Sequence, residues 1–206
     1  MLTCAFFVTV PRTSNTLAPR PRSAFCAKAF GLVPLLAAFL LVSCISNDPG
    51  GTTPQELGQA LAALSPTIDR GEADRVAERI YTTAARLRRE YGVTSSAGWH
   101  NFLIQSGARK KGYCFHYAED ILASLRPLHI KTLDVHWATA DPGTDTESNC
   151  LIFTATGEPL ETGILIDAWR EGGRVFWKRA NADRDYKWHE DNSAYARARM
   201  AEFHVP

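Results

Sequence analysis

A cysteine in the middle of the chain stands where a catalytic nucleophile would. The loop Gly112-Tyr113-Cys114 leads into apolar residues that predict a helix as far as Arg126-Pro127. A thiol at a helix N-terminus lies at the positive end of the helix dipole, which lowers the thiol pKa and favours the nucleophilic thiolate. The position of Cys114 therefore indicates covalent catalysis, and the alternative is an ordinary buried cysteine.

The elements that must position this cysteine change in periodicity along the chain. Helical spacing and cap residues predict helices over residues 54–64, 72–91, 99–105 and 192–203. Alternating or β-branched runs between turn residues predict strands over residues 133–139, 150–156, 164–169 and 175–177. Helices followed by neighbouring strands are typical of an α+β fold with an antiparallel β-meander.

The N-terminal segment has the layout of a bacterial export signal. Four basic residues and no acidic one precede an apolar stretch from Ala29 to Val42, which is short for a membrane span. The stretch ends in Leu41-Val42-Ser43-Cys44, and this order resembles the lipobox of bacterial lipoproteins. In that family the cysteine is acylated and the chain is cut directly before it. An ordinary secretory signal or an apolar anchor that happens to end in cysteine is the alternative.

This resemblance implies a domain organisation and a location. Residues 1–43 would be a signal peptide, 44–54 a lipidated tether, and 55–206 a single domain. Acyl chains on Cys44 would hold the chain on a membrane lipid surface. Ile45 instead of aspartate after the cysteine implies the outer membrane of the cell envelope, on its periplasm-facing side.

The charge of the remaining chain bears on its partners. Removal of residues 1–43 takes away four of the 23 Lys and Arg residues, which leaves 19 against 22 Asp and Glu and a formal charge of −3. A mildly acidic domain lacks the basic surface that nucleic acid requires, so we expect no nucleic-acid partner.

A second resemblance concerns the predicted domain. The Gly112-Tyr113-Cys114 loop, the helix after it, and an aspartate before Trp169 on a later strand resemble the bacterial transglutaminase-like superfamily over roughly residues 75–190. The resemblance implies a papain-like core with a Cys-His-Asp triad, in which Cys114 is the nucleophile and Asp167 orients the imidazole. Taken alone, Asp167 is better explained as a strand-end carboxylate that caps a neighbouring turn.

The chain departs from the family pattern at the position of the triad histidine. Ser148, which lies 34 residues after Cys114 and 19 before Asp167, occupies that slot. A serine cannot act as a general base near neutral pH. Three outcomes follow: the domain is an inactive relative, His136 on the neighbouring strand replaces the missing base, or Cys114 and Cys150 form a disulfide.

Two functions remain open at this point. The favoured one is a binding or structural lipoprotein on a degenerate transglutaminase-like scaffold, with a peptide or an envelope protein as its partner. The alternative is a thiol-dependent acyltransferase or hydrolase that acts on peptide or amide substrates through Cys114. The sequence contains no metal-ligand spacing and no phosphate or dinucleotide loop, so we expect neither a metal nor a cofactor.

Overall fold

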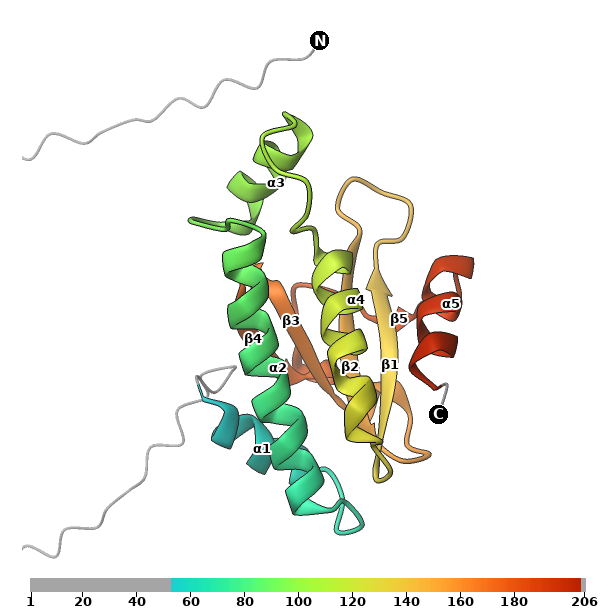
Figure 1. Ribbon diagram of the computed structural model, residues 1–206. Coiled ribbons are helices and arrows are strands. Elements are labelled where there is room, and N and C mark those ends of the chain that lie inside the picture. The colour runs from blue at the N-terminus through green and yellow to red at the C-terminus, as the bar shows by residue number, and fades with distance from the viewer. Residues whose placement is uncertain (1–52, 205–206) are drawn as a thin grey trace, which may run out of the picture. The chain divides into compact units, whose positions relative to one another are not determined.

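The computed structural model of the protein describes residues 53–204. The predicted signal peptide, the acylation site Cys44 and the tether as far as residue 52 lie outside the described residues. The described part contains helices and an antiparallel sheet, which confirms the predicted α+β class (Figure 1). No helix in residues 53–204 combines the length and the apolar character needed to cross a membrane.

Five α-helices are present in the described part, close to where the periodicity predicts them. They are α1 (Pro54–Ala62), α2 (Arg70–Glu90), α3 (Ala97–Gln105), α4 (Cys114–Leu125) and α5 (Ala194–Phe203). Four begin at a residue whose side chain accepts a hydrogen bond from the backbone N–H three residues on, which satisfies a donor that the helix cannot. These caps are Thr53, Asp69, Ser96 and Ser193.

The sheet is a meander of antiparallel strands in the order β4-β3-β2-β1-β5. Its strands are β1 (Leu133–Ala140), β2 (Ser148–Ala155), β3 (Ile164–Glu171), β4 (Arg174–Arg179) and β5 (His189–Glu190). Three short 3₁₀ helices, η1 (Arg126–Leu128), η2 (Leu160–Thr162) and η3 (Ala180–Ala182), lie in the connections. The two-residue β5 has no sequence signal, because it pairs with β1 only after the chain has returned across the sheet.

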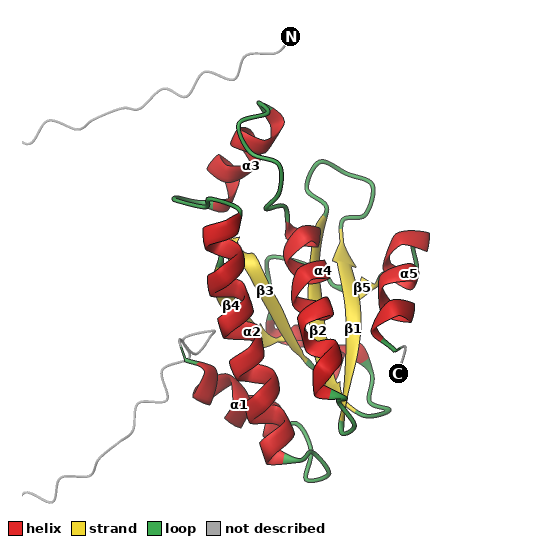
Figure 2. Cartoon of the chain, viewed as in Figure 1, coloured by secondary structure: helices red, strands yellow, loops and turns green. Residues whose placement is uncertain are grey.

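The two faces of the sheet are covered differently. Helices α2 and α4 pack on one face, and α5 packs beside α4 against β1 (Figure 2). Because side chains alternate along a strand, Trp137, Leu151 and Phe153 join the core beneath the helices. Cys150 and Leu165 point to the other face, which Trp188 and its neighbours cover. The face on which a residue lies therefore decides whether it can approach Cys114.

The register between β1 and β2 differs from the prediction. A turn near Pro142-Gly143 predicts residue 136 opposite residue 148 or 149, but the structure pairs His136 with Ile152 and Ser148 with Ala140. The prediction was wrong because the connection, residues 141–147, is a longer loop than a tight turn. Counted from residue 148 the shift is four residues, an even number, so His136 and Ser148 still share one face of the sheet; counted from residue 149 it is three.

Candidate functional site

Cys114 is the first residue of α4, as the sequence predicts. Tyr113 precedes it with extended backbone. The Nδ1 atom of His116 accepts hydrogen bonds from the backbone N–H groups of Gly112 and Tyr113, both at 3.2 Å. His116 therefore caps the start of the helix with its own ring, and this ring nitrogen is not directed at Cys114.

The loop that presents Cys114 is held from the side of α3. The buried His100 lies with Nε2 2.9 Å from the carbonyl oxygen of Lys111. Gly112 follows with φ +125°, a conformation that L side chains rarely adopt, and a Cβ there would overlap the His100 ring. Glycine is thus required where the loop enters the helix.

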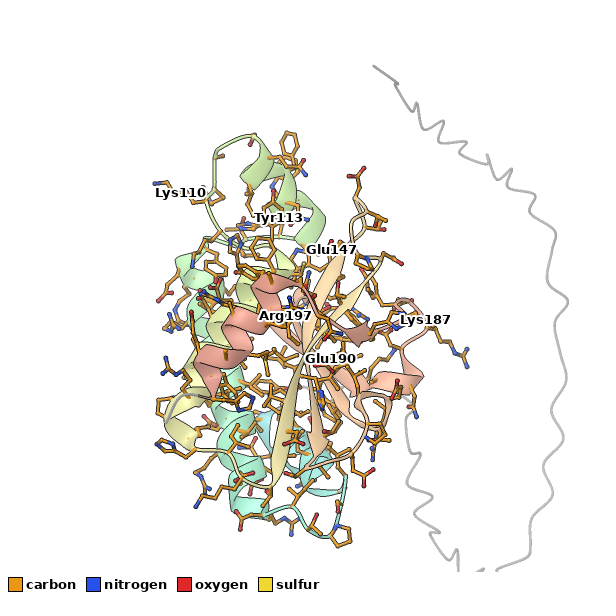
Figure 3. The ribbon with its side chains drawn as sticks, turned by 90° about the vertical axis from the view of Figure 1, so that its right-hand side faces the viewer. Lys110, Tyr113, Glu147, Lys187, Glu190 and Arg197 are labelled. Carbon is orange, nitrogen blue, oxygen red and sulfur yellow. The ribbon has the colours of Figure 1, made fainter. Side chains whose placement is uncertain are left out.

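The sulfur of Cys114 lies in a mostly enclosed site at the ends of α4 and β2. Its residue is 9% exposed, and Sγ donates a long hydrogen bond to the carbonyl oxygen of Glu147 at 3.9 Å. Figure 3 shows Tyr113 and Glu147 at the same end of the domain. Hydrogen bonds from the backbone and the side chain of Asn149 also act on the thiol. The strand residue beside the nucleophile position is therefore Asn149.

The pKa of the Cys114 thiol is raised, against the prediction. Burial is the main cause, and the negative charge of Asp167 adds to it. The hydrogen bonds from Asn149 and from the backbone of Phe115 lower the pKa but do not overcome the burial. The prediction of a lowered pKa was wrong because the helix terminus is only one influence, and loss of hydration outweighs it. The thiol is protonated at neutral pH.

Asn149, and not Ser148, occupies the strand position next to Cys114. Alternation along β2 places Ser148 on the face of Cys150 and Ile152, away from the helices. Asn149 faces the helices, and its Oδ1 accepts a hydrogen bond from Trp137 Nε1 at 2.9 Å. The sequence signal for Asn149 is its parity with the apolar Leu151 and Phe153. An asparagine amide, like a serine hydroxyl, cannot accept the thiol proton.

His136 does not replace the missing base. Its Nδ1 lies 2.9 Å from Glu190 Oε2, and its Nε2 lies 3.0 Å from Thr154 Oγ1. Both ring nitrogens are thus engaged on the sheet face that α4 does not cover. The proposal of His136 as a substitute base was wrong because, in this register, the imidazole serves the contact between β1 and its neighbours β2 and β5.

Asp167 binds an arginine instead of an imidazole. The residue is 2% exposed, and its Oδ1 accepts hydrogen bonds from the backbone N–H groups of Trp169 and Arg170 at 2.9 and 3.0 Å. Its Oδ2 accepts from Arg170 Nε at 3.1 Å. This matches the alternative of a carboxylate that caps a turn at a strand end, here at an irregularity in the pairing of β3 with β4. Burial raises the pKa of Asp167, although Arg170 opposes the change.

Cys150 completes the predicted set. Cys114 and Cys150 are both free, buried thiols in the structure, so no disulfide links them. Cys150 packs in the apolar cluster on the second sheet face, and burial raises its pKa well above the usual value. Its surroundings are those of a core residue.

Arg170 is the centre of a polar cluster that has no sequence signal. Its guanidinium binds both carboxylate oxygens of Asp183, at 2.8 and 3.3 Å, besides Asp167. The same group lies over the rings of Phe176 and Tyr186, 4.4 and 4.7 Å from their centroids. Because these residues come from β3, β4 and the segment after η3, the cluster ties that segment to the second sheet face.

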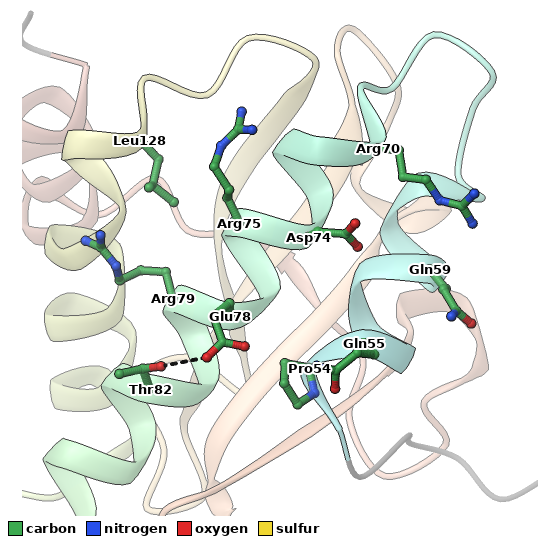
Figure 4. A pocket seen from close by; sticks show the side chains of 10 residues that line it. All are labelled: Pro54, Gln55, Gln59, Arg70, Asp74, Arg75, Glu78, Arg79, Thr82 and Leu128. Carbon is green, nitrogen blue, oxygen red and sulfur yellow. Dashed lines mark hydrogen bonds between the residues drawn. The ribbon is translucent and has the colours of Figure 1, made fainter.

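The described residues also line two cavities, and Cys114 is not among the lining residues of either. One, of about 690 Å³, lies between α1, α2 and η1, and three arginines share it with Asp74 and Glu78 (Figure 4). The other, of about 530 Å³, lies beside the segment 180–189. In residues 53–204 no three His, Cys, Asp or Glu side chains gather as metal ligands would.

Comparisons with protein families, with curated proteins and with solved structures found no match to this chain. Within residues 53–204 no hydrogen bond joins Cys114 to another sequence-predicted site residue; Asp167 acts on the thiol only through its charge, and its carboxylate binds Arg170. His136, Ser148 and Cys150 lie on the other face of the sheet.

Proposed function

We propose that the chain is a lipoprotein of the bacterial cell envelope that uses a degenerate transglutaminase-like domain for binding. Acylated Cys44 anchors it to the periplasm-facing side of a membrane, the outer membrane in a Gram-negative envelope. Residues 55–206 then present a surface to a peptide or an envelope protein. The arrangement of a cysteine at a helix start against an antiparallel sheet supports this kinship with thiol acyltransferases.

The surroundings of the Cys114 thiol support the non-enzymatic part of the proposal. The strand position beside the Cys114 thiol holds Asn149, whose amide cannot accept a proton, and burial raises the thiol pKa. In a Cys-His pair, the imidazole both lowers the thiol pKa and removes the proton. Among the described residues, the only hydrogen-bond acceptor found for the Cys114 sulfur is the carbonyl oxygen of Glu147. A neutral thiol with such neighbours is a poor nucleophile.

The reactivity of Cys114 tests this part. The chain is alkylated with iodoacetamide from about pH 6 to about pH 10, and peptide mass spectrometry follows each cysteine separately. We expect the rate at Cys114 to rise with a midpoint above the free-cysteine pKa of about 8.5. Cys150, which is fully enclosed, is the matched control in the same chain and should react more slowly. A Cys114 midpoint below about pH 7 would instead support the acyltransferase or hydrolase alternative.

A histidine introduced next to Cys114 provides a second, independent test of the same site. Asn149→His places an imidazole on the face of β2 that meets Cys114. If the domain is a degenerate thiol-enzyme scaffold, the alkylation rate of Cys114 at pH 7 should rise about tenfold or more, because an imidazolium partner lowers a thiol pKa to about 3.5–7.5. Ser148→His, on the opposite face, is the control and should leave the rate unchanged. Equal rates in both variants would argue against the proposed kinship.

The membrane anchor is tested separately from the thiol site. Cells that express the chain are fed an alkyne-labelled fatty acid, and the labelled protein is detected after gel electrophoresis. We expect incorporation in the wild type and none in Cys44→Ser, whereas Cys114→Ser should keep the label. Incorporation that survives Cys44→Ser would reject the lipoprotein assignment without bearing on Cys114.

A further inference from the structure

Helix α3 presents two large aromatic rings to solvent. Trp99 and Phe102 are 51% and 54% exposed, although the opposite side of the helix is buried through Ala97 and His100. The rings stack on each other with centroids 5.2 Å apart and an interplanar angle of 27°. They form a small apolar platform at the end of the domain that α3 occupies (Figure 1). Contiguous exposed apolar surface of this kind marks an interaction site.

The exposure of this platform does not result from a loosely held helix. Ser96 caps the first turn, and Asn101 Oδ1 accepts a hydrogen bond from Trp169 Nε1 at 3.1 Å. His100 Nε2 is 2.9 Å from the Lys111 carbonyl oxygen. Tyr195, the other large hydrophobic residue exposed in the described part, satisfies its hydroxyl on Glu119. Trp99 has no such partner for its indole N–H within residues 53–204. Its ring is therefore exposed on a helix that the Ser96, His100 and Asn101 contacts fix in place.

A basic loop borders the aromatic platform. Arg109, Lys110 and Lys111 follow α3 directly and are exposed, and residues 91–118 contain no aspartate or glutamate. Lys111 Nζ is 3.4 Å from Asp120, whereas Lys110 makes no ion pair with any described residue. Figure 3 shows the Lys110 side chain extending away from the body of the domain. The positive charge is confined to this segment: the loop between β1 and β2, at the same end of the domain, carries Asp141, Asp145 and Glu147 (Figure 1).

We propose that α3 and the loop 109–111 dock on an anionic phospholipid bilayer. Trp99 and Phe102 enter the headgroup region, where aromatic side chains are favoured, and Lys110 and Lys111 contact lipid phosphates. Two exposed aromatic rings followed along the chain by exposed cationic side chains suit the headgroup region of an anionic lipid surface. This contact is additional to the acyl anchor and does not depend on lipidation of Cys44.

The fluorescence of Trp99 tests the docking in the full chain. The chain is mixed with vesicles of phosphatidylcholine, with or without phosphatidylglycerol, whose acyl chains carry bromine as a quencher. The difference between the wild type and Trp99→Phe isolates the Trp99 emission from that of the other four tryptophans. With phosphatidylglycerol present, we expect a blue shift and about twofold or greater quenching, because an interfacial helix buries its apolar face about 5–10 Å into the boundary.

Charge reversal at the border separates electrostatic docking from general adhesion. Lys110→Glu combined with Lys111→Glu should abolish the quenching of Trp99, and about 1 M salt should weaken it in the wild type. Arg184→Glu combined with Lys187→Glu, at exposed positions after η3, is the matched control and should leave the quenching intact. Circular dichroism confirms that each variant is folded.

Two results would overturn this inference. One is a Trp99 emission that is unaffected by bromine in vesicles containing phosphatidylglycerol. The other is quenching that persists unchanged in the Lys110→Glu and Lys111→Glu variant. Neither result bears on the proposed function, which the fatty-acid labelling of Cys44 and the alkylation of Cys114 test separately.

Discussion

The guanidinium of Arg170 and the carboxylate of Asp167 bind each other inside the protein, with Nε 3.1 Å from Oδ2. Only two residues separate them, yet both side chains are largely withdrawn from solvent. The other side of the guanidinium is bound by Asp183. Asp167, which the sequence predicts as a triad carboxylate, therefore belongs to a buried ion cluster. Four predictions follow from this arrangement and from the site around Cys114.

Replacement of Arg170 should be the most destabilising of these changes. Arg170→Gln leaves the buried carboxylate of Asp167 without its cation and Asp183 with Lys178 alone, 3.6 Å away, and breaking a buried pair in this way costs about 3–5 kcal/mol. The matched control is Arg174→Gln, whose pair with Glu171 is exposed and should contribute at most about 1 kcal/mol. Denaturant unfolding of both variants gives the two free energies. Equal losses in the two variants would contradict a buried cluster.

Acid should weaken the cluster through Asp183. Burial alone would raise the Asp183 pKa, but its hydrogen bonds from Arg170 and Trp188 prevail and lower it below 3.8. A lowered folded-state pKa gives stability that is present above the unfolded pKa and is lost as the pH falls through the folded value. The contribution of Asp167 depends on pH in the opposite direction, because its folded-state pKa is raised. It stabilises the fold below pH 3.8, and this stability is lost as the pH rises through the folded-state pKa.

Asp183→Asn measures the Asp183 contribution by itself. At pH 7 the variant should be less stable than the wild type by about 1–3 kcal/mol, because it loses charged hydrogen bonds. The difference should shrink as the pH falls below 3.8, where the wild-type carboxylate is itself neutralised. Urea unfolding at several pH values tests this. Asp145→Asn, in the exposed loop between β1 and β2, should show no such trend.

His136→Ala should affect stability and leave the thiol unchanged. The variant loses hydrogen bonds to Glu190 and Thr154, each of which contributes about 0.5–1.5 kcal/mol. The alkylation rate of Cys114 at pH 8 should stay within about twofold of the wild type, since a general base would contribute about 10²–10⁴-fold. A drop of that larger size would restore His136 as the partner of Cys114. Asn149→Ala removes a side-chain hydrogen bond to the thiol, so it is the positive control and should change the Cys114 alkylation rate.

Gly112→Ala should disturb the loop that positions Cys114. The positive φ at Gly112 and the nearby His100 ring both oppose a Cβ, so we expect a loss of about 1–3 kcal/mol. Gly98→Ala is the control, because a Cβ there meets nothing within 4 Å and alanine favours a helix by about 0.5–1 kcal/mol. Thermal unfolding distinguishes the expected destabilisation by Gly112→Ala from the expected stabilisation by Gly98→Ala. A stable Gly112→Ala variant would show that the loop adapts.

The local features of this chain follow from residues that are neighbours in sequence. Thr53 and Ser193 begin helices because their side chains accept the backbone N–H groups just after them. The alternation of residues 133–139 predicts a strand, and a strand forms there. Cys114 likewise stands at the start of a helix, since the apolar spacing that follows it is a local signal.

The candidate site depended on contacts that no local pattern contains. The length of the 141–147 loop sets which residues β1 and β2 bring together, so it decided the partners of His136. Helices α2 and α4 could have covered either face of the sheet. Because they pack on the face that carries Leu151 and Phe153, Asn149, and not Ser148, lies beside Cys114. The ion cluster of Arg170 joins segments that meet only after the sheet has formed.

The sequence alone determined the α+β class, the Thr53 cap and the position of a thiol at a helix start, because these arise from interactions over a few residues. Only the tertiary structure decided that this thiol is buried, that Asn149 lies beside it and that its pKa is raised. Hydration, charge and hydrogen bonding at one atom depend on every segment packed around it. A pKa is therefore a property of the folded surroundings, and the residue type supplies only its starting value.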